Sequence, residues 1–97
     1  MISPEKYIIR NSEVIWRVLD DEIFVINPDG KNVHVLNKVA SFIWELSEGN
    51  IKVMQIVNRV CDRFDISADV ALADTSELVE KMLAKSLIEL SDTPQQQ

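Results

Sequence analysis

Apolar residues in the first third of the chain cluster in three short runs separated by turn residues, which is the pattern of β-strands. The runs at 14–18, 22–27 and 32–36 are rich in β-branched or aromatic side chains. Between the second and third lies the sequence NPDG at 27–30. Its proline presets φ, and its glycine accepts the left-handed backbone of a tight turn. The pattern predicts a three-stranded antiparallel meander.

From residue 37 the apolar spacing changes from two residues to 3.6, which indicates amphipathic helices. Asn37 and Ser67 are suitable N-caps for the first and third helix. Gly49 is expected to cap the end of the first helix, and Ser86 stands where the third should end. The apolar faces of the three helices are Val39, Phe42, Ile43 and Leu46; Val53, Ile56, Val57, Val60 and Phe64; and Leu78, Val79, Met82 and Leu83.

The order of these elements, βββααα, belongs to the α+β class. It predicts a three-stranded antiparallel β-meander followed by three helices, in a winged helix-turn-helix-like arrangement. A chain of 97 residues suffices for one domain with a modest core. We expect an extended N-terminal arm at 1–12, the folded domain at 13–90 and a disordered polar tail at 91–97.

Charge and hydropathy exclude some partners. The formal net charge of −6 disfavours nucleic acid, whose binding relies on lysine and arginine at the phosphates. No apolar run approaches the roughly 20 residues of a membrane span. The first residues also lack the basic and apolar regions of a secretory signal. We therefore expect a cytoplasmic protein with no nucleic-acid and no membrane partner.

Residues able to carry chemistry are few. The acidic run at 20–22 is interpreted as a solvated turn, His34 as a surface residue and Cys61 as a buried structural thiol. Neither a metal-ligand spacing nor a glycine-rich phosphate loop is present, since Gly30 and Gly49 are the only glycines. We predict no catalytic residue, no metal and no cofactor, and thus a protein that is not an enzyme.

The third predicted strand is the most informative surface. The segment 32–36 contains no proline, and only Lys31 supplies a charge at its edge. An extended peptide could therefore pair with it by strand addition. Alternatively, the strand is central in the sheet or covered by the N-terminal arm. The sequence pattern leaves both arrangements open.

Several short motifs in this region occur in a fixed order. They are HVLN at 34–37, IWEL at 43–46, and then Gly49. Together they resemble the PqqD family, small peptide-binding proteins also called recognition elements of ribosomally made, post-translationally modified peptides (RiPPs). The resemblance covers about 14–90. Further matching positions are Trp16, Arg17, Ile56, Asp74, Leu87 and Ile88.

The resemblance implies that the leader segment of a precursor peptide binds as an added strand beside the third strand and against the third helix. It also implies delivery of that peptide to a modifying enzyme of the lasso-peptide or radical SAM type. The partner would be, for example, a radical SAM enzyme or a leader peptidase. The expected enzyme-docking surfaces are Trp44, off the apolar stripe of its helix, and the outer side of the second helix. Core packing is the favoured alternative for Val79 and Leu83. The implied peptide-binding residues are Asn32, Val33, His34, Val35, Leu36, Thr75, Leu78, Val79 and Met82.

The chain departs from the family pattern at three places. Lys52 stands where the family often has a capping serine or threonine. Ser86 replaces a frequent glycine, which costs about 1 kcal/mol if the residue is left-handed. Thr75 and Ser76 are polar where apolar residues are common, so the lining of the groove stays open.

Two other functions compete with peptide recognition. In a winged-helix DNA-binding transcriptional regulator, the third helix would read the duplex. That helix instead carries four carboxylates against Lys81 and Lys85, which disfavours this alternative. The other is a structural subunit that dimerises through its open strand edge. For the peptide-binding protein we expect a monomer or a weak dimer.

Overall fold

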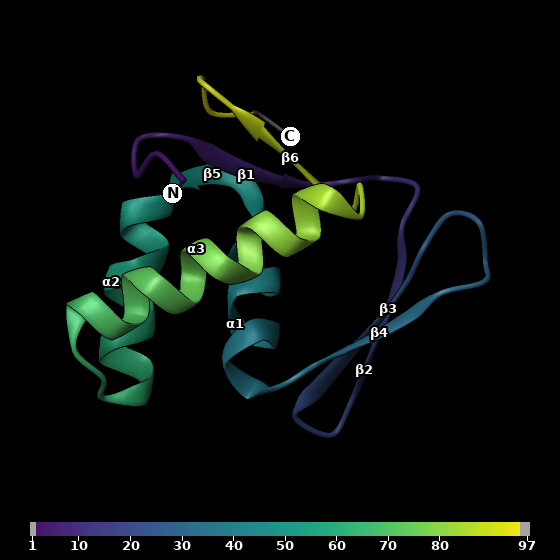
Figure 1. Ribbon diagram of the computed structural model, residues 1–97, viewed down its shortest axis with the longest axis horizontal. Coiled ribbons are helices and arrows are strands. Elements are labelled where there is room, and N and C mark those ends of the chain that lie inside the picture. Colours follow the sequence, from purple (N-terminus) through teal and green to yellow (C-terminus); the bar gives the residue numbers. More distant parts are fainter. Residues whose placement is uncertain (1, 96–97) are drawn as a thin grey trace.

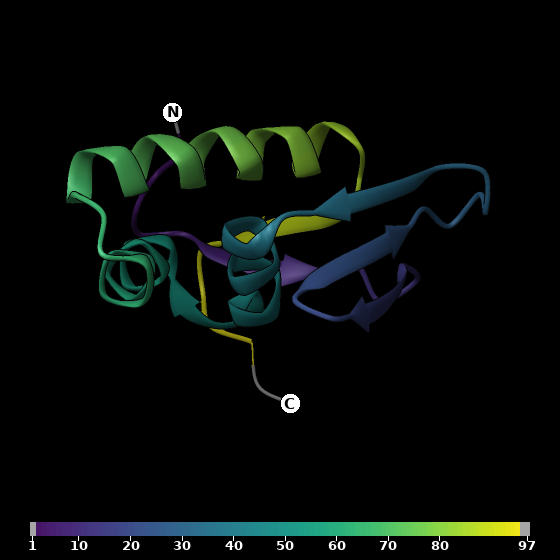
Figure 2. The ribbon, with the colours of Figure 1, turned by 90° about the horizontal axis from the view of Figure 1, so that it is seen from below.

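The computed structural model describes residues 2–95, and one of its two sheets is the predicted meander (Figure 1). Strands β2 (Ile15–Leu19), β3 (Glu22–Ile26) and β4 (Val33–Leu36) pair antiparallel in that order, with β3 in the middle. The β3–β4 hairpin extends away from the helices (Figure 2). The predicted meander is therefore confirmed.

Three helices follow the meander, as predicted. They are α1 (Lys38–Leu46), α2 (Val53–Phe64) and α3 (Ala68–Ala84). The Asn37 side chain accepts the N–H of Ala40, the third residue of α1, at 2.9 Å, and Ser67 Oγ accepts that of Val70, the third residue of α3, at 3.3 Å. The α+β class and the winged-helix-like arrangement are thus confirmed.

The end of α1 differs from the prediction. The helix ends at Leu46, and Ser47 rather than Gly49 is its C-cap. Ser47 Oγ donates to the carbonyl of Ile43 at 2.7 Å, and its N–H donates to that of Trp44 at 3.1 Å. These bonds satisfy carbonyls that the helix leaves free, so no glycine is needed there.

A second antiparallel sheet was not predicted from sequence. Its order is β5 (Glu48–Lys52), β1 (Tyr7–Arg10) and β6 (Ile88–Ser91), so both ends of the described chain meet in it. Part of the predicted arm is thus β1, and the predicted tail begins at the end of β6; residues 96–97 lie outside the described residues.

Both sheets and all three helices contribute to one core, and α3 lies across α1 and α2 (Figures 1 and 2). Cys61 is half-buried beside this core rather than fully buried as expected. Ser86 has the left-handed φ of +59° that the family pattern implied. The largest fully buried side chains include Ile8, Ile23, Ile43, Trp44, Ile56 and Leu87.

Trp44 is fully buried, so the prediction that it docks an enzyme from an exposed position is wrong. Its ring meets that of Trp16 edge to face at 6.2 Å. The guanidinium of Arg10 lies over both rings, at 5.1 and 6.0 Å, and donates to the carbonyl of Trp44 at 2.8 Å. Strands β1 and β2 therefore cover the side of α1 that the helical pattern left exposed.

The hydroxyl of Ser41 joins α1 to the meander. Ser41 Oγ accepts the N–H of Ile23 at 3.0 Å and donates to the carbonyl of Leu36 at 3.0 Å. Ile23 and Leu36 are paired residues of β3 and β4, so the hydroxyl stands between the two strands where their pairing ends. All three residues are buried.

We predict that Ser41→Ala lowers the free energy of unfolding by about 2 kcal/mol, because it leaves a buried N–H and a buried carbonyl without partners. Chemical denaturation of both proteins measures the loss. Ser12→Ala, at an exposed serine, is the control and should change stability by less than about 0.5 kcal/mol. Equal effects of the two substitutions would contradict the bridging role.

Gly49 permits a close approach between β5 and its neighbours. It has a φ of +82°, and an added Cβ would lie 2.9 Å from Cγ1 of Ile9 and 3.0 Å from the side chain of Gln95. The N–H of Gln95 also donates to the Gly49 carbonyl at 2.8 Å. Gly30 has a similar φ of +72° but open space around it.

We therefore predict that Gly49→Ala destabilises the fold more than Gly30→Ala. Both substitutions force alanine into a left-handed backbone, at about 1 kcal/mol each. Only Gly49→Ala adds a steric overlap, which costs a further 1 kcal/mol or more, roughly. Thermal and chemical unfolding of the two variants give the comparison. Equal losses would show that the close approach is not required.

Candidate functional site

Strand β4 is an edge strand of the meander. It pairs with β3 on one side, and among residues 2–95 no segment pairs with its other side. The N-terminal segment does not cover it, because β1 pairs with β5 and β6 instead. The arrangement with a central or arm-covered third strand is therefore wrong, and the open edge is a feature of the fold.

The free backbone groups of this edge belong to Val33 and Val35. The N–H of Asn27 donates to the carbonyl of Asn32 at 3.0 Å, which makes these two a hydrogen-bonded pair. In an antiparallel ladder such pairs alternate, so His34 is bonded to β3. The N–H and C=O groups of Val33 and Val35 then point outward, at the spacing that an added strand requires.

A groove of about 240 Å³ runs between this edge and α3. Figure 2 shows β4 running toward α1 below the C-terminal part of α3. The floor of the groove is apolar, whereas Lys81 and Lys85 stand exposed at its mouth. The apolar residues that line it are Val35, Leu36, Ala40, Leu78, Met82 and Leu87.

A second hollow of about 280 Å³ continues the groove toward the start of α3. It shares Leu78 and Lys81 with the first and adds the carboxylates of Asp74 and Glu77. Glu77 forms an ion pair with Lys81 at 3.2 Å. From Asp74 to Lys85 the helix rises about 17 Å, at about 1.5 Å per residue. That length suits about five residues of extended peptide.

The structure brings only some of the sequence-predicted site residues together. His34, Val35 and Leu36 line the groove opposite Leu78 and Met82. Asn32 lies in the turn before β4, and Val33 points to the outer face of the sheet with 56% of its surface exposed. Two of the predicted site residues on α3, Thr75 and Val79, are fully buried and lie in the core instead.

Sequence reasoning missed the charged residues along the groove. Asp74, Glu77, Lys81 and Lys85 follow one another at intervals of three or four residues. That spacing places them on one face of a helix, which was the available signal. In the sequence these charges were used as an argument against DNA binding, and Asp74 was noted as a position that matches the family pattern, but none was expected to line the groove. Asn37, Ala40 and Leu87 were also missed as lining residues.

His34 closes one end of the groove. Its Nε2 contacts Oδ1 of Asn27, whose amide in turn donates to the carbonyl of Lys85 at 3.2 Å. Half-burial lowers the pKa of His34 below its usual 6.5, and the Lys85 charge lowers it further, whereas Asp29 opposes the shift. His34 is therefore neutral at pH 7, and it is half-buried rather than a surface residue as expected.

The outer face of the meander carries apolar side chains that nothing in the described chain covers. Ile15, Leu19, Val33 and Val35 are each more than half exposed, and the strand register places them on one face. Among residues 2–95, no helix is long and apolar enough to cross a membrane, and no group of three histidine, cysteine or carboxylate side chains is arranged to hold a metal.

These features define a class of protein: a small winged-helix-like domain with an open strand edge beside a helix-walled groove. The family model for coenzyme PQQ synthesis protein D (PqqD) matches residues 22–88. The chain therefore belongs to the PqqD family, and the resemblance seen in the sequence is confirmed.

One solved structure shares this fold over nearly the whole length of its own chain. It is described as "TbiB1 in Complex with the TbiA(beta) Leader Peptide" and aligns with a TM-score of 0.76. The alignment covers 84% of this chain and 94% of that one, at 22% sequence identity. At this identity the similarity shows the fold. No curated protein matches this chain in sequence.

We predict that NMR titration of the His34 ring gives a pKa below 6.5. Lys85→Ala should raise this pKa, and Asp29→Asn should lower it, because the first removes a repelling charge and the second an attracting one. The contribution of neutral His34 to the free energy of unfolding is complete above pH 6.5, and it is lost as the pH falls through the pKa of His34 in the folded state. A pKa at or above 6.5, or shifts in the opposite order, would contradict this environment.

Proposed function

We propose that the chain recognises the leader segment of a ribosomally made precursor peptide and delivers that peptide to a modifying enzyme of the lasso-peptide or radical SAM type. The observation that carries the proposal is the open edge of β4 facing a groove against α3. Membership of the PqqD family supports it. So does the similar fold of TbiB1, whose structure is described as a complex with a leader peptide.

In the proposed complex, the leader pairs with the outward N–H and C=O groups of Val33 and Val35 and becomes a fourth strand of the meander. Alternate leader side chains then point toward α3. They enter an apolar space bounded by Leu78 and Met82. Backbone pairing supplies affinity for any extended peptide, so recognition of a particular leader comes from these alternate side chains.

The charges along the groove favour one orientation of the leader. Lys85 lies beside His34 at one end, and Asp74 lies at the other. An acidic leader residue is favoured near Lys85 and a basic one near Asp74, with apolar residues between them. Reversing the leader would place like charges together at both ends.

In this function the domain acts by tethering. Holding the leader keeps the rest of the precursor near the enzyme, at an effective concentration of the order of mM for a short flexible connection. The domain itself then contributes no catalytic group. No specific observation favours the DNA-binding alternative, since α3 presents Asp74 and Glu77 as well as lysines along the groove.

The sharpest test is Val35→Pro. Proline is tolerated on an edge strand where the lost N–H points outward, so the β3–β4 ladder should survive. The leader loses a hydrogen bond and meets the proline ring, which should weaken its binding at least about tenfold. Val35→Thr keeps the N–H and is the matched control, expected to stay within about threefold.

Binding is measured with labelled leader peptides of precursors encoded beside this gene, and folding is checked by amide NMR spectra. Wild-type shifts should concentrate in β4 and from Leu78 to Lys85. Equal affinities of Val35→Pro and Val35→Thr would exclude strand addition at this edge. Absence of leader binding by the wild type would overturn the proposed function itself.

A further inference from the structure

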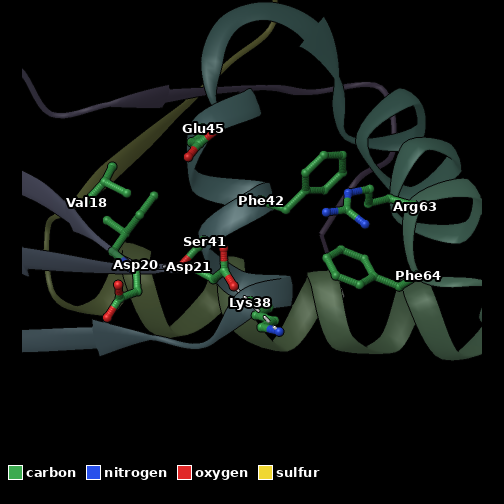
Figure 3. A pocket seen from close by; sticks show the side chains of 10 residues that line it. Val18, Asp20, Asp21, Lys38, Ser41, Phe42, Glu45, Arg63 and Phe64 are labelled. Atoms are coloured by element: carbon green, nitrogen blue, oxygen red, sulfur yellow. Dashed lines mark hydrogen bonds and ion pairs between the residues drawn. The ribbon is translucent and has the colours of Figure 1, made fainter.

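A separate hollow, distinct from the groove and its continuation, lies on the other side of α1. It measures about 400 Å³, and its walls are the β2–β3 hairpin, α1 and the C-terminal end of α2 (Figure 3). Ser41 and Ile23 lie at its base, where the hydroxyl bridge holds α1 against the meander. The walls are therefore fixed by buried contacts, although the hollow itself opens to solvent.

Two phenyl rings form one wall of this hollow. Phe42 and Phe64 meet edge to face, with ring centres 5.6 Å apart, and both are half-buried. The guanidinium of Arg63 lies 5.3 Å from the centre of the Phe64 ring. Figure 3 shows Phe42, Arg63 and Phe64 close together on the right, with the hairpin residues Val18 and Asp20 on the left. Phe42 thus adds an aromatic ring to the part of the hollow formed by α1.

Three carboxylates also border the hollow: Asp20 and Asp21 on the β2–β3 hairpin, and Glu45 on α1, one turn along from Phe42. Lys38 lies 3.7 Å from Asp21, so that carboxylate already has a partner. Within the part of the chain that the structure describes, no cation lies within ion-pair distance of Asp20 or Glu45. A basic side chain entering here would meet two uncompensated carboxylates and the Phe42 ring, a combination that suits a cation.

The hollow is separate from the groove. The residues that line it include none of those that line the groove or its continuation. Helix α1 presents Asn37 and Ala40 to the groove, and Phe42 and Glu45 to the hollow. A protein bound in the hollow would therefore leave the β4 edge free for the leader. Tethering requires two sites that can be filled at once.

We propose that this hollow is the docking site of the modifying enzyme, which inserts an arginine or lysine side chain between Asp20 and Glu45 and packs the stem of that side chain on Phe42. The inference rests on the proposed function, because it assumes that the chain delivers a peptide to an enzyme. The net charge of −6 adds to it, since an acidic adaptor associates faster with a basic enzyme surface.

The test compares charge reversal inside and outside the hollow. Glu45→Lys changes an exposed residue at the hollow, and Glu89→Lys makes the same change at an exposed position of β6. The ligand is the purified modifying enzyme or leader peptidase encoded beside this gene, with the leader already bound to the adaptor. Glu45→Lys should weaken enzyme binding at least tenfold. Glu89→Lys should stay within threefold of the wild type.

A milder variant guards against misfolding. Asp20 has a φ of +57°, a conformation that asparagine also tolerates, so Asp20→Asn combined with Glu45→Gln removes both charges and keeps the backbone preference. This double variant should bind the leader as the wild type does. Its binding to the enzyme should be weaker and less sensitive to salt, because the attraction lost is between charges.

The outcomes separate the two proposals. Failure of the wild type to bind a leader overturns the proposed function. Normal leader binding with unchanged enzyme affinity in the double variant overturns the docking site alone. Amide NMR signals of the labelled adaptor, recorded with unlabelled enzyme, should change at Ile23, Phe42 and Glu45. Changes confined to the outer sheet face at Ile15 and Val33 would also overturn the docking site.

Discussion

The buried hydroxyl of Ser41 sets the geometry on which both surfaces of this protein depend. It stands between the N–H of Ile23 and the carbonyl of Leu36, so β4 stops pairing there and the chain turns into α1 at Asn37. The same two bonds hold α1 against the meander in a low-dielectric site, where each unpaired group would be costly. One face of α1 then borders the groove and the other borders the hollow.

The second sheet explains why the edge of β4 stays open. The N-terminal segment could pair with β4, but β1 pairs with β5 and β6 and is held there by Arg10. That arginine stacks on two tryptophan rings and donates to the carbonyls of Trp44 and Glu45 at the end of α1. Moving β1 to β4 would break these contacts and expose Trp44. The fold therefore secures its N-terminal segment away from the open edge of β4.

Local patterns were enough to predict the three helices, which extend over enough residues to show their period, and the meander, whose strands follow one another directly along the chain with the NPDG turn between two of them. They also led to the family and to half of the groove, the part formed by β4, Leu78 and Met82. Strands β1, β5 and β6 are as short as those of the meander but pair over long sequence distances, so no neighbouring strand or turn marks them in the sequence. The error at Trp44 follows directly, since β1 and β2 bury it. Thr75 has a polar hydroxyl yet is fully buried, so its residue type did not indicate whether it faces the groove or the core.

The two proposed sites lie on opposite faces of one helix, so their ligands are expected to bind independently unless α1 itself moves. Coupling between leader and enzyme would have to pass through α1, where Ser41 binds both β3 and β4. A ligand shifts an equilibrium only by its differential affinity for two states, and a helix fixed by buried bonds offers no second state at low cost. In the proposed complex, faster modification therefore comes from the effective concentration of the tethered precursor rather than from allosteric activation. In this proposal the chain can serve precursors that differ beyond the leader, because only the leader would lie in the groove.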